Sequence, residues 1–163
     1  MAGVRRRQKG GYFPRRADAP PSVCLCVRRR VSFSDVDPMG ILWHGRYANY
    51  FEQANEELGR RCGMSYTDFR AEGLRAPIVQ FHVDYFASPV LGEEVAIRGR
   101  LIWDDGARLN TEYEIVKEDG TLAATGYSIQ MFVTEQGEPL YVSPPMLQRC
   151  RQRWLNGEFA DLP

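Results

Sequence analysis

The sequence predicts an α+β fold in which an antiparallel sheet of about five strands wraps around one long central helix. Residues 47–61 carry apolar side chains at helical spacing, whereas most of the remaining chain alternates polar and apolar residues, as strands do. The alternating segments are joined by short turns, so neighbouring strands are expected to be antiparallel. One face of such a sheet needs cover, and residues 47–61 form the only predicted element long and apolar enough to provide it.

The helices are predicted from periodicity and from their end signals. The apolar stripe of the long helix consists of Tyr47, Phe51, Ala54 and Leu58. Gly63 is placed to end this helix. A short helix is expected over residues 65–72, with Ser65 as its N-cap. A last helix is expected to open at Pro144-Pro145 and to run to about Trp154.

The strands are predicted from alternation and from the turns between them. Asp104-Asp105-Gly106 and Glu118-Asp119-Gly120 are typical hairpin turns. The expected strands cover residues 23–33, 78–86, 94–103, 109–117 and 122–134, with a short edge strand over 139–142.

Composition excludes several classes of protein. The 163 residues suit a single domain, and 21 basic residues balance 21 acidic ones, which argues against a nucleic-acid binder. No apolar run is long enough to span a membrane, and no apolar stretch of a signal peptide follows the basic N-terminus. The four cysteines and two histidines lack zinc spacing. We therefore expect a cytoplasmic protein with reduced thiols, without a metal site or cofactor.

The chain divides into two parts by composition. Residues 1–22 are rich in arginine, contain Gly10-Gly11 and Pro20-Pro21, and show no periodicity. They are predicted to form a basic disordered tail, with a polyanion-binding arm as the alternative. Residues 23–163 are predicted to form the folded domain.

The densest polar chemistry lies between the first strand and the long helix. Asp35 and Asp37 precede a turn marked by Pro38 and Gly40, and His44 stands just before the helix. A carboxylate is ionised at neutral pH and can act as a nucleophile or a base, while free N–H groups at a helix N-terminus can stabilise an oxyanion. Alternatively, Asp37 forms an Asx turn ahead of Pro38. Asp35 is expected to hold the turn by hydrogen bonds rather than to share the chemistry.

This stretch resembles the motif of the 4-hydroxybenzoyl-CoA thioesterase family of hotdog-fold enzymes. The matching residues are Asp35, Asp37, Gly40, His44, Tyr47 and Glu52. The segments 76–79 and 91–95 also resemble the family's strand starts, and the resemblance covers about residues 24–154. It implies a hotdog fold, and an acyl-CoA thioesterase that hydrolyses a thioester to a free acid and CoA.

The resemblance also implies roles for individual residues. Asp37 is expected to be the nucleophile or general base, with Gly40 in the turn and the His44 N–H in the oxyanion hole. The His44 side chain either contacts the acyl group or orients Asp37, or it simply caps the helix. Other substrate contacts are expected from Met39, Trp43, Tyr47, Pro77 and Ile78. Glu52 is expected to be a buried or interfacial hydrogen-bonding residue.

Coenzyme A binding is expected from Arg98, Arg100 and Arg108, although the family's third hairpin is often basic and here contains Asp104 and Asp105. An arginine group at positions 149, 151 and 153 is the alternative. An acyl-carrier-protein thioesterase and a non-catalytic acyl-CoA binding protein remain open alternatives. The family's edge strand implies a homodimer, or a homotetramer, in which residues 77–80 of the partner subunit complete each site.

Overall fold

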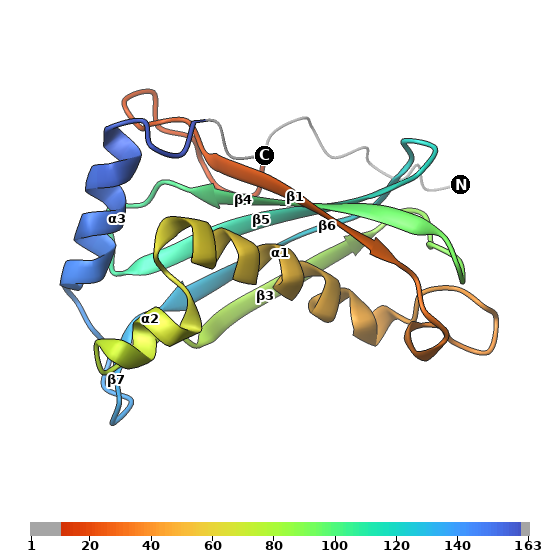
Figure 1. Ribbon diagram of the computed structural model, residues 1–163, viewed down its shortest axis with the longest axis horizontal. Coiled ribbons are helices and arrows are strands. Elements are labelled where there is room, and N and C mark those ends of the chain that lie inside the picture. The colour runs from red at the N-terminus through yellow and green to blue at the C-terminus, as the bar shows by residue number, and fades with distance from the viewer. Residues whose placement is uncertain (1–10, 161–163) are drawn as a thin grey trace, which may run out of the picture.

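The computed structural model describes residues 11–160 and confirms the predicted α+β architecture. One antiparallel sheet has the strand order β1-β4-β5-β6-β3, so β1 and β3 are its two edges. Helix α1 (Tyr47–Cys62) lies along one face of this sheet, as Figure 1 shows. The strands are β1 (Val23–Arg30), β3 (Ile78–Tyr85), β4 (Glu94–Ile102), β5 (Arg108–Lys117) and β6 (Leu122–Met131).

Helix α1 buries the predicted apolar stripe against the sheet. The ring of Phe51 stacks on Tyr113 of β5 with a centroid distance of 4.7 Å. Gly99 of β4 permits a close approach, because a Cβ there would lie 2.9 Å from the Leu58 side chain and 3.2 Å from that of Ala54. The helix ends where predicted, at Gly63, whose φ of 70° is left-handed.

Shorter elements surround this core. Two 3-10 helices, η1 (Phe33–Asp35) and η2 (His44–Arg46), connect β1 to α1. Helix α2 (Tyr66–Ala71) begins at the predicted N-cap, Ser65, and is followed by β2 (Leu74–Arg75). Helix α3 (Pro145–Leu155) packs across one end of the sheet, where Trp154 contacts Trp103 with a ring centroid distance of 5.2 Å (Figure 1).

Three predicted strands differ from the structure. β1 ends at Arg30 rather than at residue 33, because the chain turns into η1 around the buried Asp35 carboxylate. The strand predicted over 122–134 breaks at Phe132, which is fully buried, and continues as β7 (Val133–Thr134), paired with β2 instead of the main sheet. The edge strand predicted over 139–142 is wrong, since that segment forms only an isolated bridge between Val133 and Pro139.

Residues 11–22, which we call the N-terminal strap, lie against the sheet face opposite α1. The Tyr12 hydroxyl donates to Asp84 at 2.7 Å, and the Phe13 N–H donates to the buried Glu112 carboxylate at 3.0 Å. The Tyr12 ring packs against Tyr127 and His82. The strap has no helix or strand, but its aromatic rings give it contacts that a composition-based prediction of a disordered tail does not anticipate. Residues 1–10 lie outside the described residues.

Two further sequence expectations concern membranes and thiols. Within residues 11–160, no helix is both long and apolar enough to cross a membrane. All four cysteines are free. Cys24 and Cys26 are exposed on one face of β1, as their spacing predicts, whereas Cys62 and Cys150 are buried.

Candidate functional site

The loop between η1 and η2 forms a tight turn that presents Asp37. The backbone N–H of Asp37 donates to the Ile41 carbonyl at 2.9 Å, and that of Gly40 donates to the Asp37 carbonyl at 2.9 Å. Gly40 has a φ of 76°, and no atom lies within 4 Å of where its Cβ would be. The glycine is therefore required by the backbone conformation and not by crowding.

The Asp37 side chain is held by the turn through one of its two oxygens. One oxygen, Oδ1, accepts hydrogen bonds from the N–H of Met39 at 2.8 Å and of Ile41 at 3.4 Å. The first of these is the contact of an Asx turn. The second oxygen, Oδ2, accepts no hydrogen bond from residues 11–160 and stays available to a ligand. The turn thus fixes the carboxylate through one oxygen while leaving the other free to react.

Asp35 anchors this loop to the rest of the fold. Its carboxylate is only 3% exposed, and Oδ2 accepts hydrogen bonds from Arg29, the Ser32 hydroxyl and the Tyr50 hydroxyl, each at 2.9 Å. The Asp35 carbonyl also accepts from the Trp43 N–H at 2.9 Å. Because β1, the loop and α1 meet at this one carboxylate, Asp35 fixes where Asp37 stands relative to the helix.

The surroundings of Asp35 determine its charge. Burial raises the pKa of Asp35, but hydrogen bonds from Ser32, Tyr50 and Arg29 outweigh it and hold the pKa below its usual value. Burial, together with the hydrogen bond to Asp35, raises the pKa of Tyr50, so its hydroxyl stays protonated. The Arg29 guanidinium also lies 4.2 Å above the Tyr50 ring. Asp35 is therefore a paired, structural carboxylate, as expected from the sequence.

The start of η2 offers free backbone donors next to the loop. As the first residue of a helical turn, His44 has an N–H without an acceptor inside that turn, and the turn continues directly into α1. The His44 side chain is exposed, and its ring lies 5.1 Å from that of Trp43. Its carbonyl accepts a hydrogen bond from the Tyr85 hydroxyl at 3.3 Å, which ties the turn to the end of β3.

The residues predicted to contact substrate fall into two groups. Met39 and Trp43 are 75% and 45% exposed beside the loop, where a ligand can reach them. Tyr47 is only 2% exposed, and its ring packs edge-on against Tyr85 at 4.8 Å, so in this chain it is a packing residue. Ile78 lies at the start of edge strand β3 and is 43% exposed.

A cavity of about 340 Å³ lies between α1 and β3. Phe51, Phe81 and Tyr113 form its aromatic wall, and Glu52 supplies its acidic group. The Glu52 carboxylate accepts a hydrogen bond from the Tyr66 hydroxyl at 2.6 Å, and burial raises its pKa. Ile78, the first residue of edge strand β3, forms part of its lining.

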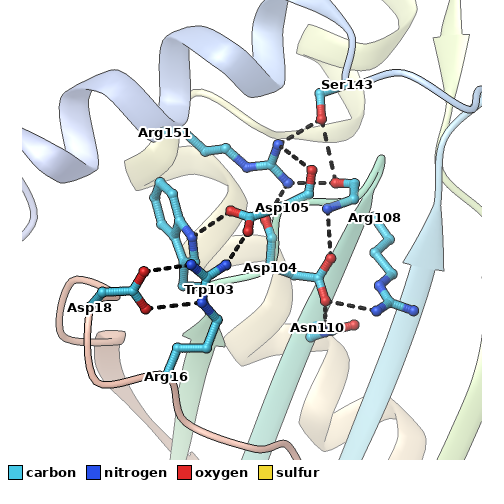
Figure 2. A network of polar contacts seen from close by, with 10 residues as sticks. Arg16, Asp18, Trp103, Asp104, Asp105, Arg108, Asn110, Ser143 and Arg151 are labelled. Atoms are coloured by element: carbon cyan, nitrogen blue, oxygen red, sulfur yellow. Dashed lines mark hydrogen bonds and ion pairs between the residues drawn. The ribbon is translucent and has the colours of Figure 1, made fainter.

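The predicted CoA-binding arginines are all paired with acids. Arg98 and Arg100 contact Glu114 at 3.7 and 2.5 Å, on the sheet face opposite α1. Arg108 contacts Asp104 at 2.8 Å, in the network that Figure 2 shows around the β4–β5 hairpin. These three roles stay predictions, but each of the three arginines already contacts a carboxylate within the chain, and Arg98 and Arg100 share that of Glu114.

The alternative arginine group is also engaged. Arg149 pairs with Glu72, and Arg153 pairs with Glu158 at 2.8 Å. Arg151 donates to the Asp105 and Gly106 carbonyls of the hairpin (Figure 2). The hairpin thus holds α3 through its backbone carbonyls and the strap through the Asp105 carboxylate, which pairs with Arg16.

Sequence reasoning missed Arg29 and Tyr50, the residues that hold Asp35. Arg29 belongs to a run of three arginines that looks like a solvated strand end, and Tyr50 falls outside the four-residue stripe used to define the helix. Their role depends on the chain turning at residue 31, which the alternation pattern did not show. No cluster of His, Cys, Asp or Glu within residues 11–160 is arranged to hold a metal ion.

Comparison with known proteins identifies the family of this chain. The model of the thioesterase-like superfamily matches residues 31–150. The chain is 29% identical over 128 residues to L-carnitine dehydrogenase/betainyl-CoA thioesterase of Agrobacterium fabrum, covering 78% of this chain but only 26% of that protein. It is 25% identical over 120 residues to the acyl-CoA thioester hydrolase YbgC of Escherichia coli O157:H7, covering 74% of this chain and 87% of that protein.

The fold has solved counterparts. The crystal structure of DHNA-CoA thioesterase from Staphylococcus aureus matches with a TM-score of 0.70 and 26% identity, covering 83% of this chain and 88% of that one. The gentisyl-coenzyme A thioesterase BH1999 matches with a TM-score of 0.67 at 18% identity, a likeness of fold alone. The predicted sheet and central helix are therefore those of the hotdog fold.

Proposed function

The chain belongs to the thioesterase-like superfamily, and from its site we propose that it hydrolyses an acyl-CoA thioester to a free acid and CoA. The observation that carries the proposal is the Asp37 carboxylate, which is held by the turn through Oδ1 and open at Oδ2. The unpaired N–H groups at the start of η2 follow in the same short segment. A negative group that attacks or activates water and a donor that receives an oxyanion are the two requirements of thioester hydrolysis.

Two routes share this arrangement. In the first, an Asp37 oxygen attacks the carbonyl carbon, the carbon–sulfur bond breaks, CoA leaves as a thiolate that takes up a proton, and water hydrolyses the mixed anhydride. In the second, Asp37 removes a proton from a water molecule that attacks the carbonyl carbon directly. A single turnover in ¹⁸O-labelled water tests for the first route. If the label is found in the Asp37 carboxylate, an anhydride has formed and water has attacked its aspartyl carbon.

A homodimer through β3 completes the proposed site. β3 is an edge of the sheet, and its apolar side chains are unusually open: Val79, Phe81 and Tyr85 are 49%, 42% and 52% exposed. Pairing of β3 with its copy satisfies the free edge and covers these side chains. It also covers the open side of the cavity between α1 and β3, so the acyl group is expected to lie against both subunits, with Pro77 and Ile78 contributed by the partner chain.

Thiol release from a panel of acyl-CoA esters tests the proposal. Aromatic, short aliphatic and longer aliphatic esters are mixed with the protein, and free thiol is followed with a thiol-reactive dye. Asp37→Asn is the test variant. Asp119→Asn is the matched control, because Asp119 makes the same side-chain turn contact, to the Thr121 N–H at 2.9 Å, in a distant hairpin.

The alternatives give different results in this assay. Release that occurs with Asp119→Asn and is lost with Asp37→Asn supports the proposed function. Release from no CoA ester, but from esters of an acyl carrier protein, supports the carrier-protein alternative. Binding of acyl-CoA without release from any thioester supports the non-catalytic alternative.

A further inference from the structure

Most arginines and lysines of residues 11–160 contact a carboxylate, whereas Arg151 donates to backbone carbonyls and to the Ser143 hydroxyl. The remaining exceptions are informative. Arg98, Arg100 and Arg108, which were expected to bind CoA, belong to the paired majority. Within residues 11–160, Arg30 donates only to the Gly92 carbonyl. The basic side chains of that range that form neither an ion pair nor a hydrogen bond belong to three arginines, Arg46, Arg70 and Arg75.

Two of these unpaired arginines flank one groove. Arg70 of α2 and Arg75 of β2 line a hollow of about 520 Å³ between α2, β2 and β7. The rest of its lining is mostly apolar: Tyr66, Phe69, Leu74, Ala76, Pro77 and Val133. We call this hollow the α2–β2 groove.

Within the described residues, the acids near the groove form no ion pair with the two arginines, and one of them, Glu135, has its carboxyl carbon 4.0 Å from where a Cβ of Gly73 would lie. Asp68 is bound by its capping box, with the Ser65 hydroxyl at 2.6 Å and N–H at 2.9 Å, and Glu72 pairs with Arg149. No carboxylate of residues 11–160 lies within 4 Å of the Arg70 or Arg75 guanidinium. An apolar hollow with two guanidinium groups that form no ion pair suits a ligand with an apolar stem and phosphate groups.

The groove cannot serve the Asp37 site of its own chain. The turn with Asp37 precedes the N-terminus of α1, whereas α2 follows its C-terminus, and a helix of 16 residues is about 24 Å long. Figure 1 shows α2 and β7 at one end of α1 and the turn at the other. Pro77, in the groove wall, leads directly into Ile78, the first residue of β3.

Dimerisation through β3 brings the groove to the other chain's site. A twofold axis perpendicular to the sheet pairs β3 with its copy in antiparallel fashion, so the start of one β3 lies beside the end of the other. That end is Tyr85, whose hydroxyl is bonded to the His44 carbonyl next to the Asp37 turn. The α2–β2 groove of one subunit therefore adjoins the catalytic turn of its partner.

We propose that the α2–β2 groove binds the pantetheine and phosphate part of the CoA whose thioester lies at the partner subunit's Asp37. The apolar walls receive the pantetheine stem, and Arg70 and Arg75 bind its phosphates. Arg46, two residues after His44, is too close to the thioester to reach phosphates that the pantetheine arm holds away from it. The proposal rests on the proposed function and on the β3 dimer, and it assigns CoA recognition to residues other than the paired arginines 98, 100 and 108.

Kinetics with matched thioesters test the groove. The esters share one acyl group: the acyl-dephospho-CoA lacks the 3′-phosphate of the acyl-CoA, and the acyl-pantetheine lacks the adenosine and all the phosphates. We expect Arg70→Gln and Arg75→Gln each to raise KM for acyl-CoA about tenfold, with kcat and the kinetics of the acyl-pantetheine unchanged. Arg60→Gln is the charge-matched control, since Arg60 is an exposed arginine paired with Glu57. A larger effect from Arg108→Gln, or no difference between the CoA and pantetheine esters in the wild type, overturns the proposal.

Mixed dimers test whether the groove acts on the partner. A chain with Asp37→Asn is co-assembled with a chain carrying Arg70→Gln and Arg75→Gln. The only intact Asp37 of the mixed dimer lies on the chain with the altered groove and faces the unaltered groove of the other chain. We therefore expect the wild-type KM and about half the wild-type kcat. An elevated KM in the mixed dimer means that the groove acts within its own chain and contradicts the proposal.

Direct binding separates this inference from the proposed function. CoA and pantetheine are titrated calorimetrically into the wild type and into the double arginine variant. If no ester is hydrolysed but CoA still binds about tenfold more weakly to the double variant, the proposed function is contradicted and CoA binding by the groove is supported. If hydrolysis depends on Asp37 but CoA binds both proteins equally, the proposed function is supported and CoA binding by the groove is contradicted.

Discussion

Removing the Tyr50 hydroxyl tests whether Asp35 holds the turn that presents Asp37. Tyr50 is fully buried, and its hydroxyl donates to the Asp35 carboxylate at 2.9 Å. A hydrogen bond to a charged group contributes about 1.5–3 kcal/mol, and in Tyr50→Phe the carboxylate keeps its bonds from Arg29 and Ser32. We therefore expect the lower part of that range, a loss of about 2 kcal/mol, which lowers the melting temperature by about 4–8 °C in a domain of this size.

The pH dependence follows from the lowered pKa of Asp35. A carboxylate with a lowered pKa in the folded state stabilises the fold above its unfolded-state pKa, and this contribution is lost as the pH falls through the folded-state pKa. Tyr50→Phe removes part of that contribution. The difference in unfolding free energy between the wild type and Tyr50→Phe is therefore largest near pH 7 and narrows below about pH 4.

Urea unfolding at several pH values measures this effect, and Tyr113→Phe is the control. The Tyr113 hydroxyl is buried and pairs with the neutral Ser128 hydroxyl at 2.8 Å, so its loss should be smaller and independent of pH in the acidic range. We also expect Tyr50→Phe to lower kcat with little change in KM, because the turn is displaced but the substrate contacts remain. A loss in Tyr50→Phe that is constant from pH 7 to pH 3 refutes the role given to Asp35.

Three other predictions concern the turn, the dimer edge and the strap. Gly40→Ala forces a left-handed φ of 76° on alanine and should lower the stability of the fold by about 1–2 kcal/mol and remove most of the activity. Gly120→Ala, with a φ of 84° in a hairpin, should lose similar stability in thermal melts and no activity. Val79→Lys places a charge on the exposed β3 edge and should shift the dimer toward monomer in analytical ultracentrifugation, with activity falling in parallel; an active monomer contradicts the shared site. Glu112→Gln weakens the bond to Arg15, which the structure gives as 2.9 Å, and should speed proteolytic cleavage in the strap without altering kcat; unchanged cleavage contradicts the docking of the strap.

The sequence predicted the elements whose signals are local. Helix α1 follows from its apolar stripe and from Gly63, and helix α2 follows from Ser65 and Gly73. The turn around Asp37 was located because Pro38 and Gly40 mark it. In each case the residues that define the element lie within a few positions of one another, so the pattern contains the needed information.

The remaining features depend on contacts between distant segments. The break at Phe132 depends on the pairing of β7 with β2, and the docking of the strap depends on Glu112, about 100 positions away. The contacts of Arg98 and Arg100 depend on Glu114 of the neighbouring strand β5. The sequence showed which residues are basic, but only the structure showed which of their charges are still unpaired.

The most direct test of the central claim is the rate of thiol release by Asp37→Asn. The best acyl-CoA substrate of the wild type is used, and Asp119→Asn is measured in parallel. A positioned general base or nucleophile contributes about 10²–10⁴-fold to the rate, so we expect Asp37→Asn to lose at least a hundredfold in kcat while remaining folded and dimeric, with Asp119→Asn unchanged. If folded Asp37→Asn releases thiol at the wild-type rate, Asp37 only shapes the turn and the proposed mechanism is contradicted.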